Sequence, residues 1–411
     1  MQTDMGLMGV DWEERINFDR MRRERLQKAK DVLAKSDLDM LLVFRPEDVR
    51  YLTGFRFHLG PVPHLGNNMV VLPKGGEPIL FTLDFAHCKA RMPWLNPDNI
   101  HPSARAISTG GTKEFVNRLK GLVGNKINGK VGVDIWDFYI EKGFRESLPN
   151  TEFVDGYEVL MQAKITKTPD ELECMRTANV ITEVGFNAAL EILKPGVKEC
   201  EVLAESWRAM TALGSEWTQC ANIVVSGPYL APYRRFTSDR HIREGDSVVI
   251  DIGGCYNGYW GDLTRTYICG NSLPTKEQKD MHQECYDAMW RGTAAARPGN
   301  TNGDILKAME RPHGMPGGGH GAGISPWEAP WISGANPDIP DTIYKLRPGM
   351  CFSLEPYAGI PYVAAAKVEN NIVVSEGPEA EVYSTYPFDE RLLYDVNARD
   401  KTTGRSRRYP K

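Results

Sequence analysis

One stretch constrains the fold of this chain more than any other: Gly245–Thr266, which reads GDSVVIDIGGCYNGYWGDLTRT. Its apolar run Val248–Ile250 predicts a buried β-strand, and Asp251 stands directly at the end of that run. Glycines then indicate a turn, and a second predicted strand, Tyr259–Tyr267, carries Asp262. Two acids on adjoining strands can converge on one point. A random pair of aspartates is nevertheless more often two ordinary turn and edge-strand acids.

Three further residues, which come later in the chain, are candidates for the same cluster. His320 lies among glycines in GGGHGAGISPWEAPW, where a bare backbone can pass close to a bound ion or substrate. Glu355 ends the strand-like run of FSLEPYAG, and Glu369 lies inside the apolar run AAAKVENNIVV. Buried carboxylates repel one another and are tolerable chiefly when cations neutralise them. The candidate set is Asp251, Asp262, His320, Glu355 and Glu369.

This set of side chains predicts a metal site. Four carboxylates and one imidazole, with no cysteine, suit Mn, Fe, Co or Zn in a paired site better than a structural zinc site. Two metals held by shared carboxylates can activate a water and polarise the bond that it attacks. The sequence therefore predicts a centre of two divalent metal ions.

The motifs around these residues resemble the pita-bread metallopeptidases, the family of prolidase, aminopeptidase P, methionine aminopeptidase and creatinase. GYWGDLTRT, GxGHGxG, SLEP and KVEN occur in the family's order, and the resemblance spans roughly residues 168–389. It implies a curved antiparallel sheet backed by helices, with the five candidates as ligands of two divalent metals. It also suggests Glu355 as a proton shuttle and His320 as a stabiliser of the developing oxyanion.

Two histidines of the prolidase-like pattern are absent from this chain. Trp327 stands directly before Glu328, where that pattern has a histidine, and the segment after SGP reads YLAPYRRFTSDR. Tyr233 and Trp327 are candidate walls of a substrate pocket, and Arg234 is a candidate clamp for a substrate carboxylate. The alternative, in which Trp327 is a packing residue and the arginines form a solvated loop, stays open.

The resemblance favours a metal-dependent hydrolase that cleaves a C–N bond, an amide such as an Xaa-Pro bond, in a small charged or dipeptide-like substrate. One alternative is the dimethylsulfoniopropionate lyase branch of the fold, which releases dimethyl sulfide by β-elimination. That branch is similar in the SGP segment and in the closing TYPFD, whereas Gly253 and the step from Glu355 to Glu369 point to hydrolysis. A second alternative is a non-catalytic binding protein, but such proteins typically lose the ligands that this chain keeps.

The length of 411 residues predicts two domains. Residues 1–165 resemble the α/β N-terminal domain of creatinase and prolidase, residues 166–395 form an α+β pita-bread domain, and residues 396–411 are a basic tail. In the second domain, Thr168 is placed to cap a helix that runs to about Leu193. In the first domain, helical and strand-like patterns alternate along the chain. They predict helices Phe18–Ser36, Lys113–Val123 and Phe138–Ser147, and strands Met40–Phe44, Asn68–Leu72, Ile79–Leu83 and Val131–Asp134.

Composition excludes several classes of protein. A net charge of −5 gives no reason to expect nucleic acid as a partner, and no run of 18 apolar residues predicts a membrane span. The eight cysteines are scattered without a CxxC pair, which favours reduced thiols and a cytoplasmic location. The loop at residues 54–68, rich in glycine and proline, is suited to complete a neighbour's pocket, so we expect a homodimer.

Overall fold

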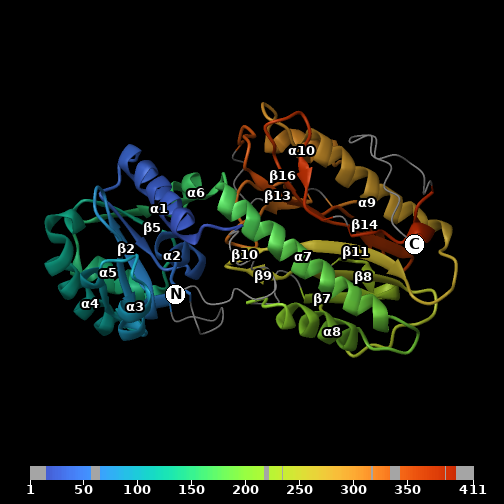
Figure 1. Ribbon diagram of the computed structural model, residues 1–411, viewed down its shortest axis with the longest axis horizontal. Helices are drawn as coiled ribbons and strands as arrows, with labels where there is room; N and C mark the ends of the chain where they lie inside the picture. Colours follow the sequence, from blue (N-terminus) through green and yellow to red (C-terminus); the bar gives the residue numbers. More distant parts are fainter. Residues whose placement is uncertain are drawn as a thin grey trace. The chain divides into compact units, whose positions relative to one another are not determined.

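The computed structural model describes residues 15–56, 65–216, 222–233, 235–315, 318–333, 343–384 and 386–394. It divides into two compact units, Ile16–Lys164 and the part from Ile165 onward. Figure 1 colours the first unit from blue through teal to green and the second from green to red. Arg234, residues 57–64 of the predicted loop and the predicted tail at 396–411 lie outside the described residues.

The first unit is built on a mixed sheet. Its strands are β1 (Met40–Val43), β2 (Met69–Pro73), β3 (Ile79–Thr82), β4 (Ile100–Pro102), β5 (Lys130–Val133) and β6 (Glu152–Asp155). Its helices are α1 (Phe18–Lys35), α2 (Pro46–Thr53), α3 (Phe85–Arg91), α4 (Thr109–Val123), α5 (Phe138–Ser147) and α6 (Tyr157–Lys164), with short 3-10 turns η2 (Leu65–Asn67), η3 (Pro97–Asn99) and η4 (Gly124–Asn128). The strand order is β4-β3-β2-β1-β5-β6.

The central strand β1 explains this architecture. All four of its residues are buried, which is the pattern of a strand covered on both faces. It pairs antiparallel with β2 and parallel with β5. Phe115 and Leu119 of α4 and Phe144 of α5 pack into the same core as Leu42 of β1. Sequence alternation predicted α1, α4, α5 and most of the strands, but not the short helices α2, α3 and α6.

The second unit consists of two halves that contain similar sets of helices and strands. Its helices are α7 (Pro169–Ile192), α8 (Glu199–Ala212), α9 (Lys276–Ala295) and α10 (Asn302–Ala308), and its 3-10 turns are η5 (Gly227–Leu230) and η6 (Glu390–Leu392). Its strands are β7 (Asn222–Ser226), β8 (Ser247–Ile252), β9 (Cys255–Tyr256), β10 (Tyr259–Trp260), β11 (Leu263–Ile268), β12 (Gly319–Gly321), β13 (Cys351–Leu354), β14 (Tyr357–Ile360), β15 (Ala364–Lys367), β16 (Asn370–Val373) and β17 (Glu381–Val382).

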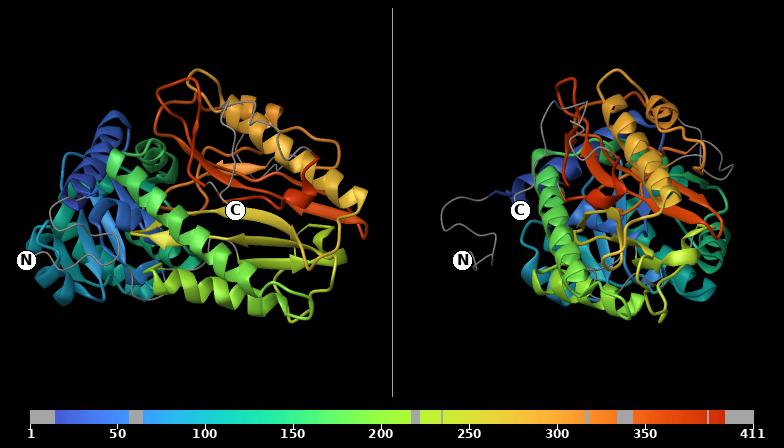
Figure 2. Two further views of the ribbon diagram at one scale, coloured as in Figure 1. Left: turned by 45° about the vertical axis from the view of Figure 1, so that its right-hand side comes forward. Right: turned by 90° about the vertical axis from the view of Figure 1, so that its right-hand side faces the viewer.

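Each half of this unit pairs two helices with one larger sheet, and the unit also contains the two-stranded sheets β10-β9 and β14-β15. Helices α7 and α8 pack on the sheet β11-β8-β7, and their shared core contains Phe186, Met210 and Ile250. Helices α9 and α10 pack with the sheet β12-β13-β16-β17, and Met289 and Phe352 belong to that second core. Both views in Figure 2 show strands lying between α7 and α9. The predicted fold class, an α/β domain followed by a pita-bread domain, is confirmed.

Two local predictions in this unit have different outcomes. Thr168 caps α7 through its side chain, and Glu171 completes a capping box, as the sequence indicated. The single strand predicted for 259–267 was wrong, because it is broken between β10 and β11 at Gly261 and Asp262. A Cβ on Gly261 would stand 2.7 Å from the Ala178 carbonyl oxygen of α7, so this helix packs directly against the break.

No described helix is both long and apolar enough to cross a membrane.

Candidate active site

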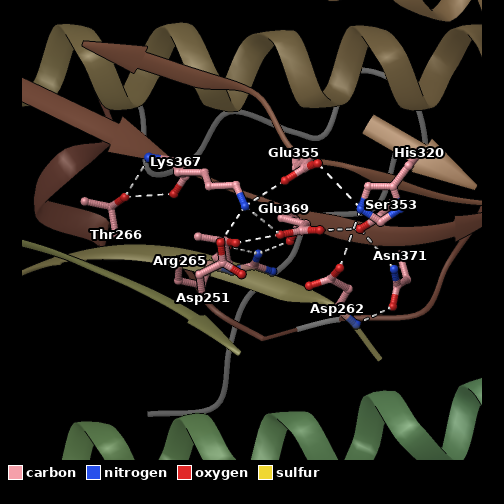
Figure 3. Close-up of polar contacts among 11 residues, drawn as sticks. Asp251, Asp262, Arg265, Thr266, His320, Ser353, Glu355, Lys367, Glu369 and Asn371 are labelled. Atoms are coloured by element: carbon pink, nitrogen blue, oxygen red, sulfur yellow. Dashed lines mark hydrogen bonds and ion pairs between the residues drawn. The ribbon is translucent and has the colours of Figure 1, made fainter. Parts of the chain in front are cut away.

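The five predicted ligands come together from both halves of the second unit (Figure 3). Asp251 lies on β8 and Asp262 directly before β11, in the first half, while His320 lies on β12 in the second half. Glu355 directly follows β13, and Glu369 lies between β15 and β16. An isolated bridge between Thr264 and Glu369 joins β11 to the second half. The cluster therefore lies where the two halves meet.

His320 is oriented with one nitrogen open to the cluster. Its ring Nδ1 lies 3.0 Å from the carbonyl oxygen of Gly321, and because a carbonyl only accepts, Nδ1 carries the proton. Its Nε2 then holds a lone pair. Nε2 lies 3.5 Å from Glu355 Oε1 and 3.7 Å from Asp262 Oδ2, too far for good hydrogen bonds. Within the described residues this buried nitrogen has no hydrogen-bond partner.

Glu369 is held by hydroxyl groups of two neighbouring strands. Thr264 donates to its Oε2 at 2.6 Å, and Ser353 donates to its Oε1. Asn371 donates to the Ser353 hydroxyl at 3.2 Å and accepts from the backbone N–H of Asp262 at 2.7 Å. These three polar side chains fix the two acids relative to each other. Sequence reasoning missed all three, because only the register of the strands brings them together.

Lys367 is the other residue that the sequence analysis missed. Its buried ammonium nitrogen Nζ lies 2.5 Å from Asp251 Oδ2, 2.7 Å from Glu355 Oε2 and 3.3 Å from Glu369 Oε2. Figure 3 shows the lysine side chain extended among these three carboxylates. A signal for it was present in the motif KVEN, since residues two apart along an extended chain point to the same side.

Burial dominates the electrostatics of the acids. Burial raises the pKa of Asp251 to about 6, although the neighbouring Lys367 acts in the opposite direction. Burial, together with the charges of Glu369 and Asp251, raises the pKa of Asp262 well above its ordinary value. For Lys367, burial alone lowers the pKa, but the three carboxylates outweigh it and hold the pKa well above its ordinary value. Burial and mutual repulsion thus disfavour the charged forms of these acids, and a bound cation would stabilise those forms.

The donor set fits a divalent metal. Asp262, His320 and Glu369 each offer a ligand atom, and these atoms lie within 4.8 Å of one another. Asp251 Oδ1 and His320 Nε2 are buried and have no hydrogen-bond partner among the described residues. Buried polar atoms are normally paired, so two such atoms facing one acidic cluster fit a site that binds a cation. Oxygen-rich ligation with one imidazole is the donor chemistry of Mn, Fe, Co and Zn sites.

Aromatic side chains adjoin the cluster on two sides. The rings of Trp327 and Trp331 lie 6.4 Å and 6.5 Å from the His320 ring, and Trp327 is 48% exposed. Tyr233 packs on Tyr357 at 4.7 Å between ring centroids, and both line an apolar hollow that also borders Lys367. Tyr233 therefore borders Lys367 and Trp327 lies beside His320, and their role as pocket walls stays a prediction. Trp331 was not among the predicted wall residues.

Two ion pairs lie next in sequence to the predicted pocket residues. Arg235 donates from Nη2 to both carboxylate oxygens of Glu199 at 2.7 Å, so it already has an internal partner. Glu328, which follows Trp327, accepts from the buried Lys167 at 2.6 Å. The position before Glu328 thus carries an exposed indole beside a buried ion pair.

Comparison with known proteins agrees with this geometry. Residues 173–376 match metallopeptidase family M24, and residues 25–163 match the creatinase/prolidase N-terminal domain. An Xaa-Pro dipeptidase of Pyrococcus furiosus is 26% identical over 362 residues, 86% of this chain and 96% of that protein. The probable dipeptidase PepE of Mycobacterium tuberculosis is 32% identical over 229 residues, 53% of this chain and 58% of the relative. The structure of an Xaa-Pro dipeptidase from Bacillus anthracis has the same fold, with a TM-score of 0.74 at 22% identity, covering 90% of this chain and 99% of that one.

Fold, acidic cluster and comparisons together define a metal-dependent hydrolase. The chain belongs to metallopeptidase family M24, preceded by a creatinase/prolidase N-terminal domain. The family predicted from the sequence is confirmed, and with it the use of divalent metal. The relatives named here are dipeptidases, which favours hydrolysis over the lyase alternative.

Proposed function

We propose that this protein hydrolyses Xaa-Pro-type dipeptides or closely similar small amides. The observation that carries the proposal is the buried cluster of Asp251, Asp262, His320, Glu355 and Glu369, in which His320 Nε2 is left open. The full-length relative from Pyrococcus furiosus, an Xaa-Pro dipeptidase, supports the substrate class.

The five clustered residues are the proposed ligands of two divalent ions, with Mn, Fe, Co and Zn as the candidates. Bound there, such ions supply an activated water and polarise the substrate carbonyl. The tautomer of His320 supports its role as a ligand, since a nitrogen with a lone pair binds metal and does not donate to an oxyanion. We therefore place His320 among the proposed ligands. We do not assign it the stabilisation of the oxyanion, which the resemblance had suggested.

Glu355 is the proposed proton carrier. Its side chain is 20% exposed, whereas those of Asp251 and Glu369 are 1% and 0% exposed, so it is the carboxylate that a substrate reaches most easily. One of its oxygens accepts from Lys367, and the other faces His320 at 3.5 Å. A carboxylate at the mouth of the cluster can take a proton from water and return it to the leaving amine.

The aromatic pocket walls are proposed to contact the substrate in place of the two histidines that are absent from this chain. The exposed face of Trp327 offers an apolar surface of the kind that a proline ring packs on, and Tyr233 offers a second wall. Arg234 is the proposed clamp for the substrate carboxylate, because its neighbour Arg235 is bound to Glu199.

The test is one incubation of metal-loaded protein with a panel of Xaa-Pro dipeptides and, separately, with dimethylsulfoniopropionate. We expect release of free proline from the dipeptides and no dimethyl sulfide. Release of dimethyl sulfide alone would make the protein a lyase, and absence of both products would refute the dipeptide substrate.

Variants link this activity to the cluster. His320→Ala and Asp251→Ala should each lower metal content and abolish turnover. Met281→Leu, which alters a buried apolar side chain of α9, is the control and should keep both properties.

A further inference from the structure

A buried carboxylate outside the acidic cluster holds together the two ends of one loop. Glu199 lies in the first turn of α8 and is fully buried. The loop, called here the 226–238 loop, begins at Ser226 at the end of β7 and ends at Ser238. Both serines donate to Glu199, from their backbone N–H groups at 2.9 and 3.1 Å and from their hydroxyls at 2.7 and 2.8 Å. One side chain of α8 therefore ties the start of the loop to its end.

Arg235 completes the set of donors around this carboxylate. Its Nη2 donates to both oxygens of Glu199 at 2.7 Å. Each oxygen thus accepts from one backbone N–H, one hydroxyl and the guanidinium. An ionised carboxylate only accepts, so it matches a shell made of donors, and a buried donor left unpaired costs free energy. Glu199 therefore suits this place as a carboxylate and as no other group of the same shape.

The loop that Glu199 closes carries a proposed wall of the substrate pocket. Tyr233 lies between the two ends of the loop, and its ring packs on the ring of Tyr357 at 4.7 Å. The Tyr357 hydroxyl donates to the carbonyl oxygen of Leu230 at 2.9 Å. Tyr357 itself pairs with Lys367 in the ladder between β14 and β15. The base of the loop is thus held by Glu199, and its middle rests on a strand pair that borders the candidate site.

Side-chain contacts set the position of this loop, because strand pairing does not. Its described residues after Ser226 form the 3-10 turn η5 and no strand. The anchor also reaches η5, since the guanidinium of Arg235 lies 5.0 Å from the ring centroid of Tyr229. Loops that bind ligands work when a rigid scaffold holds them in the binding geometry. Here the scaffold is α8, and Glu199 is its point of attachment.

We propose that Glu199 is a positioning residue for substrate binding, which holds the loop that carries Tyr233 without touching the substrate itself. Through this loop it fixes the Tyr233 ring at the hollow that borders Lys367. Loss of the anchor weakens substrate binding and leaves the metal ligands in place. The inference rests on the proposed function in one respect, that Tyr233 contacts the substrate.

The first test is Glu199→Gln in metal-loaded full-length protein. The amide keeps the shape of the side chain but replaces one accepting oxygen with an NH₂ group, which cannot accept from a backbone N–H. We expect KM for an Xaa-Pro dipeptide to rise about tenfold, kcat to change by less than about twofold and bound metal to stay as in the wild type. A fall in kcat at unchanged KM would overturn the proposal.

Glu205→Gln is the matched control. It makes the same substitution on the same helix, at a side chain that is 37% exposed and paired with Arg208. Exposed ion pairs of this kind contribute little to stability, so KM, kcat and metal content should all equal those of the wild type. An equal rise of KM in both variants would contradict a specific role of Glu199.

Arg235→Met tests the anchor from the side of the loop. It removes the guanidinium and should also raise KM. In the double variant with Glu199→Gln, KM should rise by less than the product of the two single effects, because both substitutions break one anchor. A rise equal to that product would overturn the proposal. If Glu199→Gln failed to fold, an unchanged KM in Arg235→Met would overturn it.

Hydrogen exchange separates the anchor from the proposed reaction. Backbone amides of residues 227–233, followed by mass spectrometry, should exchange about tenfold faster in Glu199→Gln than in the wild type or in Glu205→Gln. Unchanged exchange would overturn the anchor whatever the activity, and faster exchange at unchanged KM would overturn its role in substrate binding. A wild-type protein that cleaves no dipeptide would refute the proposed substrate, while exchange would still decide whether Glu199 holds the loop.

Discussion

His282 shows at the scale of one residue how burial sets acid stability. It is fully buried on α9, packed near Tyr286 and Phe388, and neither ring nitrogen has a hydrogen-bond partner among the described residues. Burial lowers its pKa to about 4, with Arg265 adding to the effect and Asp389 opposing it. The folded protein therefore holds this imidazole neutral, while the unfolded chain protonates it at its ordinary pKa of 6.5.

We therefore predict an acid-induced loss of stability that traces to His282. A folded pKa below the unfolded one contributes stability above pH 6.5 that is lost as pH falls towards 4, about 3 kcal/mol in full. Urea unfolding of the second unit between pH 7.5 and 4.5 should show this slope, and His282→Leu should flatten it. Met281→Leu, which removes no titratable group, should keep the slope of the wild type. An unchanged slope in His282→Leu would contradict the assignment.

The sequence predicted the ligands better than their surroundings. Asp251 and Glu369 could be found because their motifs place acids in apolar runs, where a charge needs a partner. Ser353 and Asn371 carry no such signal, since a serine or asparagine in a strand is unremarkable until the register places it beside an acid. Lys367 was visible in KVEN but was read as part of a motif and not as a charge inside the cluster.

At the scale of elements, the break between β10 and β11 is where sequence patterning failed. The apolar and aromatic residues of 259–267 favour one continuous strand. Packing against α7 overrides that pattern, because Gly261 lies against the Ala178 carbonyl and the Thr182 hydroxyl. The helix caps were predictable for the opposite reason, since a capping box such as Thr168 with Glu171 is a local interaction within four residues.

The break yields a prediction at Gly261. A Cβ there would stand 2.6 Å from Thr182 Oγ1 and 2.7 Å from the Ala178 carbonyl oxygen, too close without a shift of α7 or of the chain that carries Asp262. Gly261→Ala should destabilise the protein by about 2 kcal/mol and lower its metal content.

Gly121 offers the matched control. It lies within α4, and a Cβ there would meet nothing within 4 Å, so Gly121→Ala should be neutral or stabilising by about 0.5–1 kcal/mol. Equal effects of the two substitutions on chemical unfolding and on metal content would contradict the packing argument.

At the scale of the whole molecule, the predicted homodimer stays a prediction. That prediction was based on the loop at residues 54–68, of which residues 57–64 lie outside the described part of the chain. Light scattering at micromolar concentration should give about twice the chain mass of 46.1 kDa. A mass of one chain would refute it.

The division into two units predicts how metal affects unfolding. The core of the first unit contains Leu119 and Phe144, whereas the proposed ligands all lie in the second unit, which has its own cores. Ligand binding stabilises only the unit that binds, by about 2.7 kcal/mol at a free concentration one hundred times the dissociation constant. A chelator should therefore lower the melting temperature of one calorimetric transition and leave the other in place.

A substitution in the other core identifies the transitions. Leu119→Ala opens a cavity in the first unit at a cost of about 2–5 kcal/mol and should move the transition that the chelator leaves unchanged. If the chelator and Leu119→Ala both shifted the same transition, the metal-binding unit and the first unit would unfold as one body. The stability of the N-terminal domain would then be coupled to metal binding, and a mutation in either core would lower the occupancy of the site.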